Sequence, residues 1–97
     1  IMRYKVGDRV VIRKDLVGER RYHYENSMGR LFFNKDMSKL CGKVCVITKI
    51  TDSELDEYFL SIGDEEIEWY FNNAMLLPAG GLKHLIMIRR QQYNESI

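Results

Sequence analysis

Cysteine and histidine side chains are the first candidates for chemistry in this chain, because thiolates and imidazoles bind metals and act as nucleophiles or bases. Cys41 and Cys45 are separated by three residues, and the two histidines are His23 and His84. Zinc sites usually combine a Cys-x-x-Cys pair with a second pair of ligands, so this spacing does not predict a metal site. No sequence signature of a nucleophilic Cys–His pair flanks either cysteine.

Carboxylates form a second group with chemical potential. Residues 50–78 contain eight Asp and Glu and no Lys or Arg, whereas residues 1–49 contain twelve Lys and Arg against five Asp and Glu. Acidic turns between strands are more often solvated than catalytic, so we predict no catalytic residue, no metal, no cofactor and no enzymatic activity. An acidic face could instead steer a partner protein, or the two charged parts could simply attract each other weakly through solvent. The predicted acidic face comprises Asp52, Glu54, Asp56, Asp64, Glu65, Glu66 and Glu68.

The basic half of the chain offers an alternative contact surface for RNA or DNA. Arginines bind phosphates and aromatic rings stack on bases. However, the net charge of the whole chain is only +1, and its carboxylates would repel a long polyanion. We therefore rank nucleic-acid binding second, after protein binding. The residues predicted for it are Arg9, Arg13, Arg20, Arg21, Tyr22, Tyr24 and Arg30.

A strand is predicted over residues 42–50, because its β-branched residues suit a pleated surface. The other strands can pair around it, so it would position the charged side chains on them. Strict alternation places Val44, Val46, Thr48 and Ile50 on one face and Lys43, Cys45, Ile47 and Lys49 on the other. Further strands are predicted over 9–14, 31–33, 57–62 and 67–71, with single helical turns after Asn34 and over 72–75. The sequence thus predicts a mainly β fold, a small barrel of about five strands with short helical turns.

Two segments remain open to more than one interpretation. Residues 17–35 have no clean period, so they form either a functional connection or a hairpin that covers the core with Tyr22 and Tyr24. Residues 79–97 follow a barrel domain predicted over 1–78, and they favour a helix, although a strand is the alternative. We expect this extension to pack on the barrel, or to form a homodimer through residues 82–93, by means of Leu82, Leu85 and Ile86.

Five motifs occur in a familiar order along residues 4–78: Tyr4-Lys5-Val6-Gly7-Asp8-Arg9-Val10, Arg13-Lys14-Asp15-Leu16, Met37 to Leu40 before Gly42-Lys43-Val44, Glu68-Trp69-Tyr70, and Ala74-Met75-Leu76-Leu77-Pro78. In this order they resemble small uncharacterised proteins of bacteriophages and Firmicutes genomes, and SH3-like barrels in general. The resemblance implies an SH3-like barrel. It also implies a non-enzymatic accessory protein of a phage or mobile element that binds, and could inhibit, a host or defence protein.

The resemblance to SH3-like barrels also suggests an aromatic groove, since such barrels bind proline-rich peptides or methylated lysines in grooves of this kind. The residues considered for it are Tyr58, Trp69 and Tyr70, although ordinary core packing with one surface tyrosine is the alternative. The sequence lacks an apolar leader and any run of the ~18 apolar residues that a membrane span needs. With its two cysteines, this predicts no membrane association and a location in the cytoplasm of a bacterial host.

Overall fold

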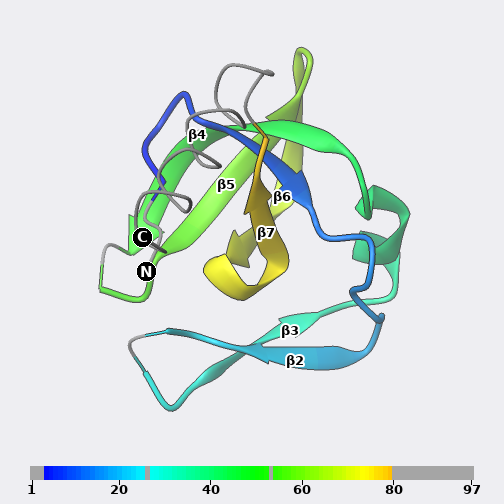
Figure 1. Ribbon diagram of the computed structural model, residues 1–97, viewed down its shortest axis with the longest axis vertical. Coiled ribbons are helices and arrows are strands. Elements are labelled where there is room, and N and C mark those ends of the chain that lie inside the picture. The colour runs from blue at the N-terminus through cyan, green and yellow to red at the C-terminus, as the bar shows by residue number, and fades with distance from the viewer. Residues whose placement is uncertain (1–3, 26, 53, 80–97) are drawn as a thin grey trace, which may run out of the picture.

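The computed structural model describes residues 4–25, 27–52 and 54–79 (Figure 1). The prediction of a mainly β, barrel-like fold with short helical turns is confirmed. In chain order the elements are β1 (Arg9–Ile12), β2 (Arg20–His23), β3 (Arg30–Phe33), the 3-10 helix η1 (Asp36–Leu40), β4 (Val44–Asp52), β5 (Glu57–Ile62), β6 (Glu65–Asn72), the 3-10 helix η2 (Asn73–Met75) and β7 (Leu76–Pro78).

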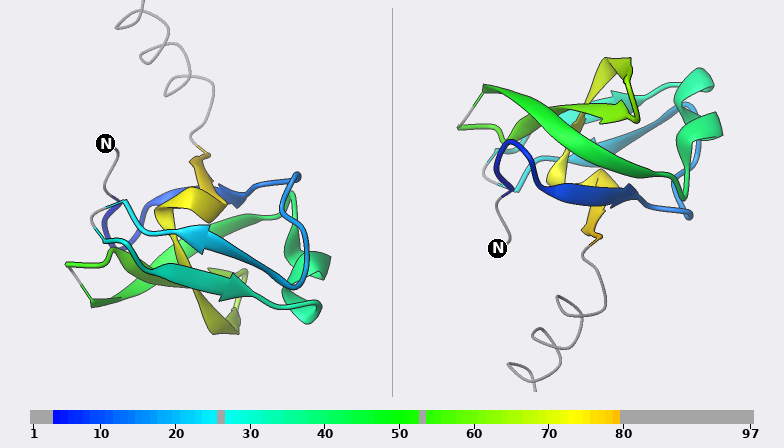
Figure 2. Two further views of the ribbon diagram at one scale, coloured as in Figure 1. Left: turned by 90° about the horizontal axis from the view of Figure 1, so that it is seen from below. Right: turned by 90° about the horizontal axis from the view of Figure 1, so that it is seen from above.

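Two antiparallel sheets make up the fold. Five strands form one curved sheet in the order β6-β5-β4-β1-β7, and β2 pairs only with β3. In Figure 1 the larger sheet arches over the β2–β3 hairpin, and the turned views in Figure 2 show the hairpin lying across one side of the sheet. The core lies between the hairpin and the sheet, so the hairpin closes the barrel without joining its hydrogen-bond ladder.

The predicted alternation along β4 holds as far as Ile47. Cys45 and Ile47 are 1% and 0% exposed, while Val44 and Val46 face outward. The pairing of β4 with β5 then shifts between Ile47 and Lys49, so that Ile50 lies opposite Tyr58 and packs against the core. Assignment of Ile50 to the same face as Val44 and Val46 is therefore wrong, because a bulge inserts one residue and reverses the faces beyond it.

The remaining predicted strands and turns occur where the sequence placed them. Val10 and Ile12 of β1 and Tyr58 and Leu60 of β5 are buried in the core. The turn before η1 is capped as expected, since the Asn34 side-chain oxygen accepts the Met37 backbone N–H at 2.9 Å. Strand β7 is an addition to the prediction, because residues 76–78 pair with β1 instead of only closing the domain.

The irregular segment 17–35 contains a hairpin, as one of the two interpretations predicted, although of the two tyrosines only Tyr22 packs with the core cluster. Phe33 is fully buried, and Tyr22 packs edge to face against it with ring centroids 6.1 Å apart. The side-chain amide of Asn72 holds the hairpin to β6 by donating to the carbonyls of Tyr22 and His23. The aromatic inner face of the hairpin thus covers the core, while its outer face remains available to solvent.

The predictions for the C-terminal extension, including Leu82, Leu85, Ile86 and the homodimer contact over 82–93, lie outside the described residues. Within the part of the chain that the structure describes, no helix has the length and apolar character needed to cross a membrane.

Candidate functional site

The predicted acidic residues do not form one continuous face, so this part of the prediction is wrong. Glu54 and Asp56 lie in the turn after β4, and Asp56 is only 6% exposed with a left-handed backbone. Asp52 is the last residue of β4. The other four members, Asp64, Glu65, Glu66 and Glu68, lie at or beyond the β5–β6 turn and are exposed. The six residues of β5 separate the two turns by about 20 Å, at roughly 3.4 Å for each residue.

The second acidic group borders a depression of about 450 Å³ beside β6. Glu65, Glu66 and Glu68 are its acidic lining residues, and the half-buried Trp69 is among its apolar ones. The end of η1 and the start of β4 contribute the opposite side. The rest of the lining consists of Leu40, Lys43, Ile62 and Ile67.

Local sequence explains how the β5–β6 hairpin builds this depression. Gly63 takes a left-handed conformation with φ of 59° in the turn, which glycine adopts at little cost. The β5–β6 register then shifts between Phe59 and Ser61, so β6 carries extra residues opposite Leu60. Ile67 points into the core, Glu68 points to solvent, and Trp69 returns to pack against the edge of the core. Three glutamates and Trp69 thus border one hollow.

The aromatic groove considered for Tyr58, Trp69 and Tyr70 does not exist as one surface. Tyr58 is 1% exposed and lies opposite Phe71 on the core side. Tyr70 lies on the outer face of the sheet, where its ring meets Phe59 edge to face at 5.8 Å. Alternation along β6 separates adjacent residues onto opposite faces, so only Trp69 of the three lines the depression.

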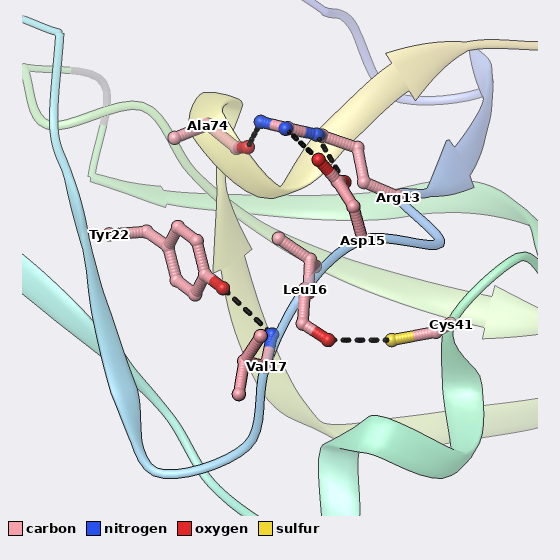
Figure 3. Close-up of polar contacts among 7 residues, drawn as sticks. All are labelled: Arg13, Asp15, Leu16, Val17, Tyr22, Cys41 and Ala74. Atoms are coloured by element: carbon pink, nitrogen blue, oxygen red, sulfur yellow. Dashed lines mark hydrogen bonds and ion pairs between the residues drawn. The ribbon is translucent and has the colours of Figure 1, made fainter.

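Arg13, one of the predicted nucleic-acid contacts, is engaged within the fold (Figure 3). Its Nη1 donates to the Ala74 carbonyl at 2.8 Å, and its Nε and Nη2 donate to the two carboxylate oxygens of Asp15 at 3.0 and 2.6 Å. The hydrogen bond from Arg13 lowers the pKa of Asp15. This guanidinium therefore ties the end of β1 to η2, and its role in binding a phosphate is not supported.

The two tyrosines of the predicted basic surface also serve the fold. The Tyr22 hydroxyl accepts the Val17 backbone N–H at 2.8 Å, as Figure 3 shows, while its ring packs on the core. The Tyr24 hydroxyl donates to the Glu57 carboxylate. Arg9 is exposed, but it lies opposite Val46 on the outer face of the large sheet. Of the seven predicted residues, the structure leaves Arg20, Arg21 and Arg30 together on one exposed element.

The outer face of the hairpin adds two residues that the sequence prediction missed for this surface. Arg21 lies opposite Phe32, and His23 lies opposite Arg30, so these four side chains share one face. All four are exposed, and the Arg21 guanidinium carbon lies 5.7 Å from the centroid of the Phe32 ring. Alternation in the run Leu31-Phe32-Phe33 was the signal that could have found Phe32, since only one of two adjacent phenylalanines can face the core.

The cysteines are held in protonated form by their surroundings. Burial raises the pKa of the Cys45 thiol to about 11 and raises that of Cys41 to a lesser extent. Cys41 Sγ donates to the Leu16 carbonyl at 3.8 Å, as drawn in Figure 3. Across residues 4–25, 27–52 and 54–79, no three His, Cys, Asp or Glu side chains are grouped to hold a metal ion. His84 lies outside these residues.

Comparison of the chain with protein families, with curated proteins and with solved structures found no match.

Proposed function

We propose that the protein is a non-enzymatic binding module that recognises a basic segment of a partner protein in the depression beside β6. The observation that carries this proposal is the combination of Trp69 with Glu65, Glu66 and Glu68 around one hollow of about 450 Å³. A cation is attracted to the face of an indole ring, and carboxylates bind ammonium and guanidinium groups through charge-assisted hydrogen bonds. Leu40 and Ile62 add apolar surface for the aliphatic part of a lysine or arginine side chain.

Negative charge around the depression should also attract a basic partner from a distance. Asp64 lies in the turn next to the depression without lining it, so it adds negative charge at the rim. A cluster of like charges steers an oppositely charged partner and raises the association rate. The volume of the depression, about 450 Å³, is within the range of sites that bind small ligands, which suits side chains of a short peptide motif.

The resemblance of residues 4–78 to phage and Firmicutes proteins extends the proposal. The order of β1, a long hairpin, three antiparallel strands, a 3-10 helix and a last short strand is compatible with an SH3-like barrel. On the resemblance alone, we propose that the partner is a host or defence protein in a bacterial cytoplasm, and that binding inhibits it.

Fluorescence of Trp69 tests the site directly, because it is the only tryptophan of the sequence. The probe is a decapeptide of alternating Lys and Leu, and its counterpart with Glu for Lys is the peptide control. We expect a saturable change with the Lys peptide only. The double variant Glu66→Lys/Glu68→Lys should weaken binding at least tenfold, which corresponds to about 1.4 kcal/mol. Asp64→Lys, which changes an exposed charge outside the lining, should weaken it by less than about threefold.

Affinity capture from a bacterial lysate, with and without nuclease, then identifies the partner. A protein that the parent chain and Asp64→Lys retain after nuclease treatment, but that the double variant does not retain, supports the proposal. Equal retention by all three chains contradicts it, provided that circular dichroism shows the double variant to be folded.

A further inference from the structure

We propose that the outer face of the β2–β3 hairpin binds single-stranded nucleic acid, with Arg21 and Arg30 on phosphates and Phe32 stacked on a base. This face is separate from the depression beside β6, so the inference does not depend on the protein-binding proposal. The register that pairs Arg21 with Phe32 and His23 with Arg30 places these four exposed residues in a block two residues wide and two residues long.

The two faces of the hairpin differ, because the inner face covers the core and this block on the outer face is exposed. Phe33 is fully buried, and Tyr22 and Leu31 pack against the core from the same side. Phe32 points the other way and is 42% exposed. Because Phe32 is exposed and lies on the same face as Arg21 and Arg30, its ring is available for contact with a ligand.

The charge of the hairpin selects an anionic ligand. The sequences of β2 and β3 contain Arg20, Arg21, His23 and Arg30 and no carboxylate. Arginine binds phosphate oxygens through a planar fork of donors, and neutralisation of phosphates releases counterions. A polyanion is therefore the complementary partner for this face.

The exposed ring selects single-stranded over double-stranded nucleic acid. Aromatic rings and guanidinium planes stack on bases that are unstacked, whereas the bases of a duplex already cover one another. The Arg21 guanidinium lies over the Phe32 ring, so the stacking surface and a phosphate ligand are adjacent. The carboxylates beside β6 would repel a long duplex more than a short flexible strand.

Fluorescence anisotropy of a fluorescein-labelled dT12 strand tests this inference with the full chain at 50 and 200 mM salt. The variant Arg21→Ala/Arg30→Ala should weaken binding at least tenfold and flatten the salt dependence of the binding constant. The matched control Arg9→Ala/Lys49→Ala removes two exposed cations from the large sheet and should weaken binding by less than about threefold. Phe32→Ala should weaken binding about tenfold with an unchanged salt dependence, and Phe32→Tyr should restore it.

Several results would overturn the inference. These are the absence of binding at 50 mM salt, equal losses in the two double variants, full binding by Phe32→Ala, or equally tight binding of a 12-base-pair duplex. All substituted side chains are exposed, and urea unfolding of each variant verifies the fold. Glu66→Lys/Glu68→Lys should still bind the strand, so failure of one proposal is distinguishable from failure of the other.

Discussion

The side-chain amide of Asn72 donates to the backbone carbonyl of Tyr22 at 3.0 Å, and it also reaches the carbonyl of His23 at 3.3 Å. Asn72 is fully buried at the end of β6, whereas both carbonyls belong to β2. One side chain thus connects the large sheet to a hairpin that shares no backbone ladder with it.

Replacement of Asn72 by leucine, which has the same branched shape without polar atoms, should destabilise the fold by about 2 kcal/mol, because it removes the side-chain donor to two carbonyls. Urea unfolding measures this loss. Asn73→Leu is the comparison, since Asn73 donates to an exposed carboxylate of Glu25 at a longer 3.3 Å. We expect a smaller loss from Asn73→Leu, and the reverse order would refute the role assigned to Asn72.

The hydroxyl of Tyr22 stabilises the connection between β1 and β2. Tyr22→Phe removes the acceptor of the Val17 N–H but keeps the ring beside Phe33, so it should cost about 1 kcal/mol. Hydrogen exchange at the Val17 amide should accelerate in this variant. Tyr22→Ala should cost more, because the packed ring is also lost; a variant pair of equal stability would argue against the contribution of the ring.

Arg13 should matter for stability and not for ligand binding. Arg13→Leu removes the donor to the Ala74 carbonyl and should cost about 1 kcal/mol. Asp15→Asn should cost less, because the ion pair that it weakens is exposed to solvent. Thermal unfolding compares the two variants. Loss of dT12 binding by a folded Arg13→Leu protein would show that this guanidinium also contacts the strand.

Stability should decline in alkaline solution through Cys45. The pKa of this thiol is raised by burial from its ordinary value near 9.0 to about 11 in the folded chain, so the folded state holds its proton more tightly than the unfolded state. The resulting stabilisation is complete below pH 9 and is lost as the pH rises to 11. Urea midpoints at pH 8, 9.5 and 11 test this. Cys45→Ala should show a shallower decline over the same interval, whatever its stability at pH 8.

The C-terminal extension leads to a proposal of self-association. Leu82, Leu85 and Ile86 are spaced for one face of a helix, and an isolated helix of this length gains stability from a partner surface. If residues 82–93 form a homodimer contact, light scattering should give twice the monomer mass for the parent chain. Leu85→Asp/Ile86→Asp should then give the monomer mass. A parent chain that is monomeric at all concentrations would exclude this contact.

The sequence predicted the strands that are rich in apolar and β-branched residues, namely β1, β3, β4, β5 and residues 67–71 of β6. It did not identify β2, because only Tyr22 in the run Arg20 to His23 faces the core. The bulge after Ile47 could not be predicted from the sequence either, because it arises from the pairing of β4 with β5 and no local sequence signal marks it. Three-residue β7 depends in the same way on its pairing with β1.

Charge along the chain proved a weaker guide to the candidate sites than strand pairing. The carboxylates cluster in sequence between 50 and 78, yet the turns that join β4 to β5 and β5 to β6 lie at opposite ends of β5, and Asp56 is buried. The basic residues divided for a similar reason, since Arg13 lies beside Asp15 and Arg21 lies on a separate sheet. The register of strand pairing determines which charged side chains lie close together, and this register is fixed by long-range packing.

The separation of the β2–β3 hairpin from the main ladder has a consequence for evolution and engineering. Substitutions on its outward positions, at Arg21, His23, Arg30 and Phe32, leave the hydrogen bonds of the five-stranded sheet intact. The requirements for grafting are a buried aromatic at Phe33, a ring at Tyr22 and two carbonyls within reach of Asn72. A hairpin of equal length that meets these requirements could replace β2 and β3, so that the same barrel would carry a different recognition surface.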